Sequence, residues 1–151
     1  TEIYTLSLHD ALPISTVFAE AAAEKSHRLV LALSSQPCMA YGDRLLLEEA
    51  AFNLVSNAVN YTPKGGTITL RTRVAEDGYV FEVADTGPGL AVEDRERIFE
   101  PFVRLKAAGQ VKGSGLGLHL VRTIVDRHAG TIAVFGRPGK GATFTVTLPS
   151  R

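Results

Sequence analysis

The pattern of apolar and polar positions divides the chain into alternating helices and strands. Three segments have the composition or the apolar periodicity of helices, and we place them at residues 16–27, 44–61 and 116–128. Shorter runs that alternate apolar with polar residues predict strands at residues 29–34, 67–74, 79–85, 131–135 and 143–148. Helices on one face of a mixed, mostly antiparallel sheet would make an α/β two-layer sandwich.

The first 15 residues fit none of these elements. They carry no start methionine, no clean amphipathic period and no helix cap. We interpret residues 1–15 as a non-native or irregular segment, such as a truncation or gene-assembly remnant, and take residues 16–151 as the domain.

Composition narrows the class of protein. The chain has 151 residues, of which 45% are apolar and 21% charged, as in one globular domain. Lys plus Arg equals Asp plus Glu at 16 each, so no net field steers the domain toward nucleic acid or a membrane surface. The single Cys38 fits a reducing compartment, and no apolar run approaches the roughly 20 residues that span a bilayer. We therefore expect a cytoplasmic domain, either free or part of a membrane-bound protein.

A polar stripe follows the long helix predicted at residues 44–61. Its members are spaced i, i+4, i+8 and i+11 or i+12, namely Glu49, Asn53, Asn57 and Asn60 or Tyr61. Asparagine is a mediocre helix former, and its carbonyl oxygen is a hard donor suited to Mg²⁺. The stripe is either a wall that faces a ligand or a solvated helix face.

An acidic residue lies on the apolar face of a predicted strand. Asp85 follows Tyr79, Phe81 and Val83 at alternate positions, and the sequence T-G-P-G-L comes directly after it. A buried carboxylate needs hydrogen-bond donors, which the exocyclic amine of adenine would supply, and the glycines let the backbone approach a ligand. The alternative is a turn that simply ends the strand.

Two further segments are rich in glycine. Residues 112–118 read K-G-S-G-L-G-L before a predicted helix, where backbone amides can bind an anion, although the spacing fits neither a Walker loop nor a Rossmann fingerprint. Residues 139–144 read G-K-G-A-T-F, an ordinary turn into a strand. Alternation puts Thr143 on the opposite face from Phe144, so Thr143 would need a bulge to reach a ligand.

Together these segments resemble the ATP-binding catalytic domain of sensor histidine kinases. They match its N, G1, F, G2 and G3 boxes in order, as F-N-L-V-S-N-A-V-N-Y-T, D-T-G-P-G-L, R-I-F-E-P-F-V-R, G-S-G-L-G-L and G-K-G-A-T-F. The resemblance covers residues 16–149. It implies the Bergerat fold, shared with gyrase, MutL and a heat-shock chaperone, with ATP and Mg²⁺ as cofactors.

The resemblance also implies roles for single residues around the base and the metal. Asp85 would bind the adenine amine, Tyr61 would lie against the adenine ring, and Thr143 would support the far edge of the base. Asn57 would hold Mg²⁺ that bridges the phosphates, with Asn53 beside it.

The remaining roles that the resemblance implies concern the phosphates and a lid. Phe99, Phe102 and residues 103–112 would form a mobile lid, from which Arg104 or Lys106 reaches the γ-phosphate. Gly87 and Gly89 would act as hinges. The G1 and G2 boxes would supply the other nucleotide contacts: Leu90, Gly113, Ser114, Gly115, Leu116, Gly117 and Leu118.

Asn60 departs from the family pattern. Many members carry Lys or Arg there, a phosphate contact that a neutral amide cannot replace electrostatically. The affinity for ATP is then lower, or Arg104, Lys106 and Lys112 compensate.

The chemistry that the resemblance implies is phosphoryl transfer rather than hydrolysis. ATPases of the superfamily activate water with a glutamate where this chain has Asn53, and an amide has no usable basicity. Glu49, one turn earlier, is a weaker candidate for a base. The expected acceptor is a histidine on a separate dimerisation domain. A response regulator is an indirect partner, which receives the phosphoryl group from that histidine.

No histidine of this chain fits that acceptor. His9 faintly mimics the acceptor motif, but it lies too close to Asn53 to leave room for a helical hairpin, and His27, His119 and His128 show no such motif. Two alternatives stay open: a stand-alone serine kinase of the anti-sigma type, and a nucleotide-binding module without catalysis.

Overall fold

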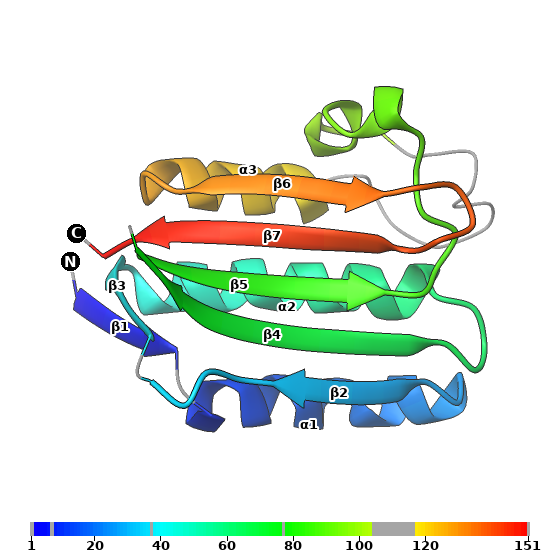
Figure 1. Cartoon of the computed structure of the whole chain (residues 1–151), viewed down its shortest axis with the longest axis horizontal. Helices are drawn as coiled ribbons and strands as arrows, with labels where there is room; N and C mark the ends of the chain where they lie inside the picture. Colours follow the sequence, from blue (N-terminus) through cyan, green and yellow to red (C-terminus); the bar gives the residue numbers. More distant parts are fainter. Residues whose placement is uncertain (1, 7, 37, 77, 104–116, 151) are drawn as a thin grey trace.

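The computed structural model describes residues 2–6, 8–36, 38–76, 78–103 and 117–150, and within these ranges five strands form one sheet. Helices cover one face of that sheet and leave the other face open (Figure 1). The strands run in the order β2 (Arg28–Ala32), β4 (Thr67–Ala75), β5 (Gly78–Asp85), β7 (Ala142–Pro149) and β6 (Thr131–Gly136). Only β2 and β4 are parallel among these neighbours, so the predicted mixed, mostly antiparallel two-layer sandwich is confirmed.

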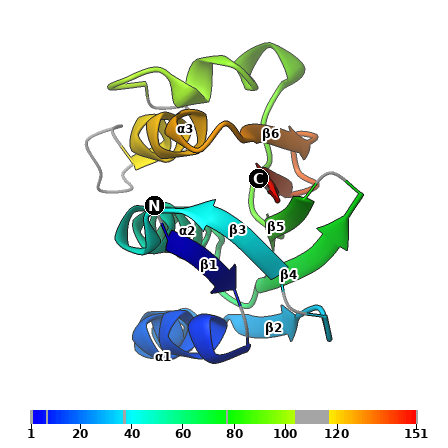
Figure 2. The same ribbon diagram turned by 90° about the vertical axis from the view of Figure 1, so that its left-hand side faces the viewer.

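The helical layer consists of α1 (Leu8–Glu24), α2 (Arg44–Tyr61) and α3 (Gly117–Arg127), seen end-on in Figure 2. The bounds of α2 match the prediction at both ends. Asp43 caps its start, because the carboxylate accepts the N–H groups of Leu45 and Leu46 at 3.0 and 3.2 Å. Pro63 ends it, since the residue before a proline is pushed to an extended conformation, as Thr62 is at ψ 124°.

One apolar core fills the space between the sheet and the helices. Alternate residues of β4, β5 and β7 point into it, and α2 and α3 each turn one buried stripe toward the sheet. Its most completely buried side chains include Leu54, Val55, Ile68, Val83, Val121, Ile124 and Val125.

The N-terminal region corrects our prediction of an irregular segment at residues 1–15. The first helix begins at Leu8 rather than at Thr16, and Glu2–Leu6 forms a strand, β1, that pairs antiparallel with β3 (Cys38–Gly42). Ile14 is 2% exposed and belongs to the core. Pro13 inside the helix weakens the local signal, and the pairing of β1 with the unpredicted β3 joins segments far apart in sequence.

Short 3-10 helices follow β5. They are η1 (Val92–Asp94) and η2 (Arg97–Phe99), and Ile98 and Phe99 of η2 are buried. Among the described residues, none of the helices combines the length and apolar character needed to cross a membrane.

Candidate functional site

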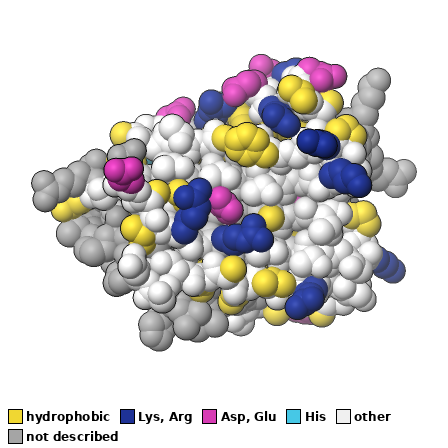
Figure 3. Space-filling model, in the orientation of Figure 1, with side chains coloured by type: hydrophobic (Ala, Val, Ile, Leu, Met, Phe, Trp, Pro, Cys, Tyr) yellow, Lys and Arg dark blue, Asp and Glu magenta, His cyan; other side chains and the backbone are white. Residues whose placement is uncertain are grey.

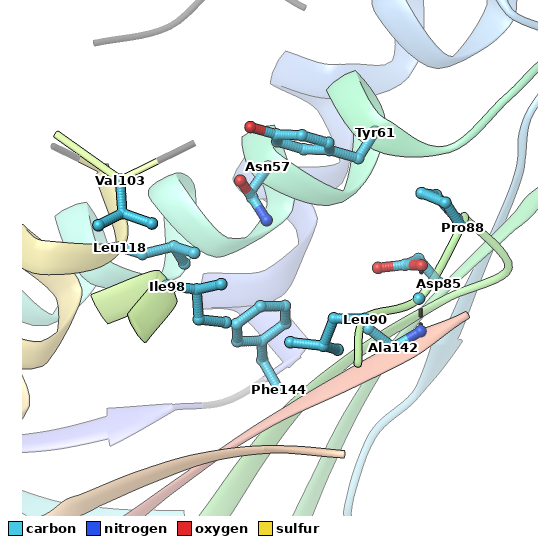
Figure 4. Close-up of a pocket in the computed structure, with 11 residues that line it drawn as sticks. Asn57, Tyr61, Asp85, Pro88, Leu90, Ile98, Val103, Leu118, Ala142 and Phe144 are labelled. Carbon is cyan, nitrogen blue, oxygen red and sulfur yellow. Dashed lines mark hydrogen bonds between the residues drawn. The ribbon is translucent and has the colours of Figure 1, made fainter. Parts of the chain in front are cut away.

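A pocket opens where the last turns of α2, the end of β5 and the start of β7 meet η2 and α3 (Figure 4). Six of its lining residues are ones that we had selected from the sequence: Asn57, Tyr61, Asp85, Gly89, Leu90 and Leu118. Val103, also a lining residue, begins the predicted lid segment, and four lining residues were not predicted as site residues: Pro88, Ile98, Ala142 and Phe144.

Asp85 is fixed by backbone donors at the end of β5. Its Oδ1 accepts the N–H of Gly87 at 2.8 Å and the N–H of Ala142, the paired residue on β7, at 3.3 Å. The other carboxylate oxygen points toward the interior of the pocket (Figure 4). Burial raises the pKa of this carboxyl, while the two N–H bonds act in the opposite direction. The site therefore presents one oriented acceptor oxygen.

Apolar side chains make up most of the remaining wall. Ile98 and Phe144 are 6% and 5% exposed, and Leu90, Val103 and Leu118 complete the surface. The Phe144 ring packs against the ring of Phe99, edge to face at 6.2 Å between centroids. A slot of this kind, with one acceptor at its edge, suits a flat heterocycle that carries an amine.

Helix α2 carries two asparagines near the pocket, of which Asn57 is a lining residue and Asn53 is not. Asn57 lines it, with its side chain directed away from the helix into the cavity (Figure 4). Asn53, one turn earlier, donates from Nδ2 to the Glu49 carbonyl at 2.8 Å, which leaves its Oδ1 as an acceptor. That oxygen faces the start of α3, because a Cβ atom added at Gly117 would lie 3.2 Å from it.

These amide oxygens fit Mg²⁺, which takes few protein ligands and completes its shell with water and phosphate oxygens. Among the described residues, no group of three or more His, Cys, Asp or Glu side chains could hold a metal. A metal at this site would therefore rely on amide oxygens and on the ligand itself.

Two glycines shape the turn after β5. A Cβ atom at Gly87 would lie 2.9 Å from Oδ1 of Asp85, and one at Gly89, whose φ is +68°, would lie 2.0 Å from the Arg137 carbonyl oxygen. Gly89 thus requires glycine, because a larger residue would be strained and would collide with backbone, whereas a Cβ atom at Gly87 would press on the carboxylate of Asp85. Their role as hinges stays a prediction.

Thr143 does not line the pocket, contrary to the role that the resemblance implied. The pairing of β5 with β7 runs without a bulge, with Ala84 opposite Thr143 and Val83 opposite Phe144. Phe144 is therefore turned inward and Thr143 toward the open face of the sheet.

Other predicted residues lie outside the pocket or outside the described part of the chain. Asn60 is exposed, and Phe102 is 72% exposed with a φ of 64°, while Val103 beside it lines the pocket. Gly117 is the first residue of α3. The rest lie outside the described residues: Arg104, Lys106, Lys112, Gly113, Ser114, Gly115 and Leu116.

Sequence signals existed for two of the missed residues. Strand alternation already put Phe144 on the inward face, and Ile98 lies within the R-I-F-E motif. Pro88, Val103 and Ala142 also lie within the quoted motifs, but no local periodicity points them toward a ligand, because their positions depend on how separate loops meet.

Comparison with known proteins agrees with this geometry. Residues 42–151 match the family described as histidine kinase-, DNA gyrase B-, and HSP90-like ATPase. The sensor-like histidine kinase SenX3 of Mycobacterium tuberculosis (strain ATCC 25618 / H37Rv) is 44% identical over 114 residues, which are 72% of this chain and 27% of SenX3. This chain thus spans about a quarter of the length of that relative.

The similar solved structures are also histidine kinases or their catalytic domains. Full-length ShkA in complex with AMPPNP is 31% identical with a TM-score of 0.85, over 98% of this chain and 31% of ShkA. The catalytic domain of histidine kinase ThkA, in a nucleotide-free form, is 26% identical with a TM-score of 0.85, over 99% of each chain. Together with the Asp85 pocket and the ordered motifs, these matches show that the chain belongs to the histidine kinase-, DNA gyrase B- and HSP90-like ATPase family and is similar to the catalytic domains of histidine kinases.

Proposed function

We propose that this domain binds Mg²⁺-ATP in the Asp85 pocket and donates the γ-phosphoryl group to a histidine of a separate dimerisation domain. The observation that carries the proposal is the carboxylate of Asp85, anchored through one oxygen and open to an apolar slot through the other. The AMPPNP bound to the similar ShkA supports an adenine nucleotide as the ligand.

Recognition of the base would rest on Asp85 and the apolar wall. The exocyclic amine of adenine donates to the open oxygen of Asp85, and Tyr61 lies against the ring at the mouth of the slot. Ile98, Leu118 and Phe144 exclude water from the ring faces, which strengthens the hydrogen bond to the carboxylate.

The phosphates would extend from this slot along α2 toward the start of α3. The amide oxygen of Asn57, with that of Asn53 beside it, would hold Mg²⁺, which neutralises phosphate charge and orients the chain of phosphates. Arg104 or Lys106, outside the described residues, would approach the γ-phosphate as a cation.

The transfer step would need little activation by this domain. The neutral imidazole of the acceptor attacks the γ-phosphorus, a nitrogen–phosphorus bond forms, and the bond to the β–γ bridging oxygen breaks as ADP leaves. Asn53 offers no basic group to activate water, so this domain contributes position and charge neutralisation. A response regulator would then receive the phosphoryl group, and the domain would work in the cytoplasm, free or as part of a membrane-bound kinase.

Calorimetry with Mg²⁺-ATP tests the binding site. Asp85→Asn should weaken binding about 10- to 100-fold, since a hydrogen bond to a charged group is worth about 1.5–3 kcal/mol. Asn57→Asp should also alter the affinity, because it changes the donor at the metal position. Thr145→Val, on the open face of β7, is the matched control and should bind as the wild type does. Equal affinity in all variants would refute the site.

Phosphotransfer in trans tests the reaction. The domain is incubated with labelled ATP and a dimerisation domain from a similar histidine kinase, with and without its acceptor histidine. Acid-labile, alkali-stable label that depends on that histidine supports the proposal. Acid-stable label on serine would instead favour the serine kinase, and tight binding without any transfer would favour a non-catalytic module.

A further inference from the structure

We infer that Arg122 is a positioning residue that holds the apolar wall of the nucleotide pocket from outside, by covering the ring of Phe99. This inference rests on the proposed function, because the wall in question is the one against which the adenine would lie. Arg122 itself does not line the pocket.

The wall depends on η2, which is a single short turn. Ile98 of η2 lines the pocket, and the next residue, Phe99, is 4% exposed and packs edge to face against Phe144 at 6.2 Å. Ile98 and Phe144 are both lining residues, so a displacement of Phe99 would move the wall at two points.

Helix α3 contacts Phe99 through two side chains, Arg122 and His119. The guanidinium carbon of Arg122 lies 4.9 Å from the centroid of the Phe99 ring, and Nδ1 of His119 lies 3.2 Å from the Phe99 carbonyl oxygen. Arg122 follows Leu118 by one helical turn, and Leu118 lines the pocket itself. One face of α3 therefore contributes Leu118 to the wall and, through Arg122, contacts Phe99 next to the wall residue Ile98.

Arg122 makes a second contact, an ion pair with Glu96, at 3.1 Å between Nη1 and Oε2. The Glu96 side chain is 85% exposed and that of Arg122 is 34% exposed. An exposed pair of this kind contributes little, whereas a cation over a buried aromatic ring is both attractive and close-packed. We therefore assign the positioning to the ring contact and not to the ion pair.

The inference is tested by calorimetry with ADP and with Mg²⁺-ATP, alongside thermal unfolding of each variant. Arg122→Met keeps the length of the side chain and removes its charge. It should weaken ADP and ATP by the same factor, about three- to fivefold, since only the base pocket is disturbed. Arg122→Lys should recover part of the loss, because an ammonium retains the attraction but covers less of the ring.

Two controls separate the ring contact from other effects. Glu96→Gln removes the ion pair, and Arg127→Met removes an exposed arginine of the same helix; both should bind nucleotide as the wild type does. All affinities are measured well below the unfolding temperature of the least stable variant.

Three results would overturn the inference. Unchanged affinity in Arg122→Met, even with a lower unfolding temperature, would make Arg122 a purely structural residue. A larger loss for ATP than for ADP would place its effect at the phosphates. Wild-type protein that binds neither nucleotide would refute the proposed function, and the inference with it.

Discussion

At the scale of single residues, Asp85 combines ligand binding with an energetic cost to the fold. Burial raises the pKa of its carboxyl, so the folded protein holds this proton more tightly than the unfolded chain does. When the pH rises past the ordinary value for aspartate, the unfolded chain loses the proton first, and folding becomes less favourable until the folded carboxyl has ionised as well. At neutral pH the ionised, partly buried carboxylate of Asp85 therefore lowers the free energy of unfolding.

We predict that Asp85→Asn raises the free energy of unfolding at neutral pH while it weakens nucleotide binding. The amide oxygen of Asn can accept the same N–H groups of Gly87 and Ala142, and no charge is buried. Urea denaturation over a series of pH values measures the effect. The difference from the wild type should shrink as the pH falls through the raised pKa of Asp85, and a variant that is less stable at neutral pH would contradict the prediction.

Gly141, in the turn just before β7, lies against the backbone of Asp85. Its φ is +76°, and a Cβ atom there would lie 2.1 Å from the backbone oxygen of Asp85. Gly139, in the same turn, has a φ of +77° with nothing within 4 Å of the added atom. Alanine would be strained by the positive φ at both positions, but only at Gly141 would its methyl group collide with the backbone of Asp85.

We predict that Gly139→Ala costs about 1 kcal/mol of stability, from the left-handed backbone alone. Gly141→Ala should cost about 2 kcal/mol more, because backbone must move to accommodate the methyl group. Only Gly141→Ala should also weaken nucleotide binding, since it displaces Asp85. Denaturation curves and calorimetry on the two variants measure these effects. Equal losses of stability and affinity in both would contradict the prediction, because the contact between the new methyl group at position 141 and the Asp85 backbone would then have no effect.

At the scale of elements, α2 presents the binding asparagines from a helix whose C-terminal end is tied down. Lys25, just after α1, donates from Nζ to the carbonyl oxygens of Val59 and Asn60 at 3.0 Å and of Thr62 at 3.2 Å. A cation at this end also opposes the negative pole of the helix dipole. The last turns of α2, with Asn57 and Tyr61, are thereby fixed beside the pocket.

We predict that Lys25→Met lowers the stability by about 1 kcal/mol, the usual worth of charge-assisted bonds at a partly exposed helix end. Nucleotide affinity should fall with it, because the turn that carries Tyr61 loses its support. Lys64→Met, at the exposed turn after α2, is the control and should leave both quantities unchanged. Thermal unfolding and calorimetry provide the readouts, and equal behaviour of the two variants would count against the role of Lys25.

At the scale of the whole molecule, α1 belongs to the same core as the sheet. Ile14 and Ala22 are each 2% exposed, and the rings of Phe18 and Phe52 lie 5.7 Å apart between α1 and α2. Ile14, which lies within residues 1–15, therefore packs in the same core as the rest of the domain.

We predict that Ile14→Ala destabilises the domain by about 2–4 kcal/mol, as is usual for a large residue removed from a core. Val17, on the same helix and 58% exposed, gives the control: Val17→Ala should change the stability by less than about 0.5 kcal/mol. Chemical denaturation of both variants measures the difference. If Ile14→Ala proves as mild as Val17→Ala, residues 1–15 lie outside the cooperative unit.

The candidate site was predictable to the extent that it follows local periodicity. Asn57 and Tyr61 could be placed on one stripe of α2, and Asp85 on the inner face of β5, because side-chain direction repeats with the helix or the strand. Ala142 could not be found in this way. Its N–H reaches Asp85 only because β7 pairs with β5 in one particular register.

The family motifs, both ends of α2 and the acid on an apolar strand face are all predictable from the amino-acid sequence without the structure. Each of these features depends on a few neighbouring residues, as the start of α2 depends on the cap at Asp43 and its end on Pro63. Three further features are visible only in the tertiary structure: the β5–β7 pairing has no bulge at Thr143, β1 pairs with β3, and Arg122 covers Phe99. These contacts join residues far apart along the chain, and their energies depend on register and packing that no local pattern encodes.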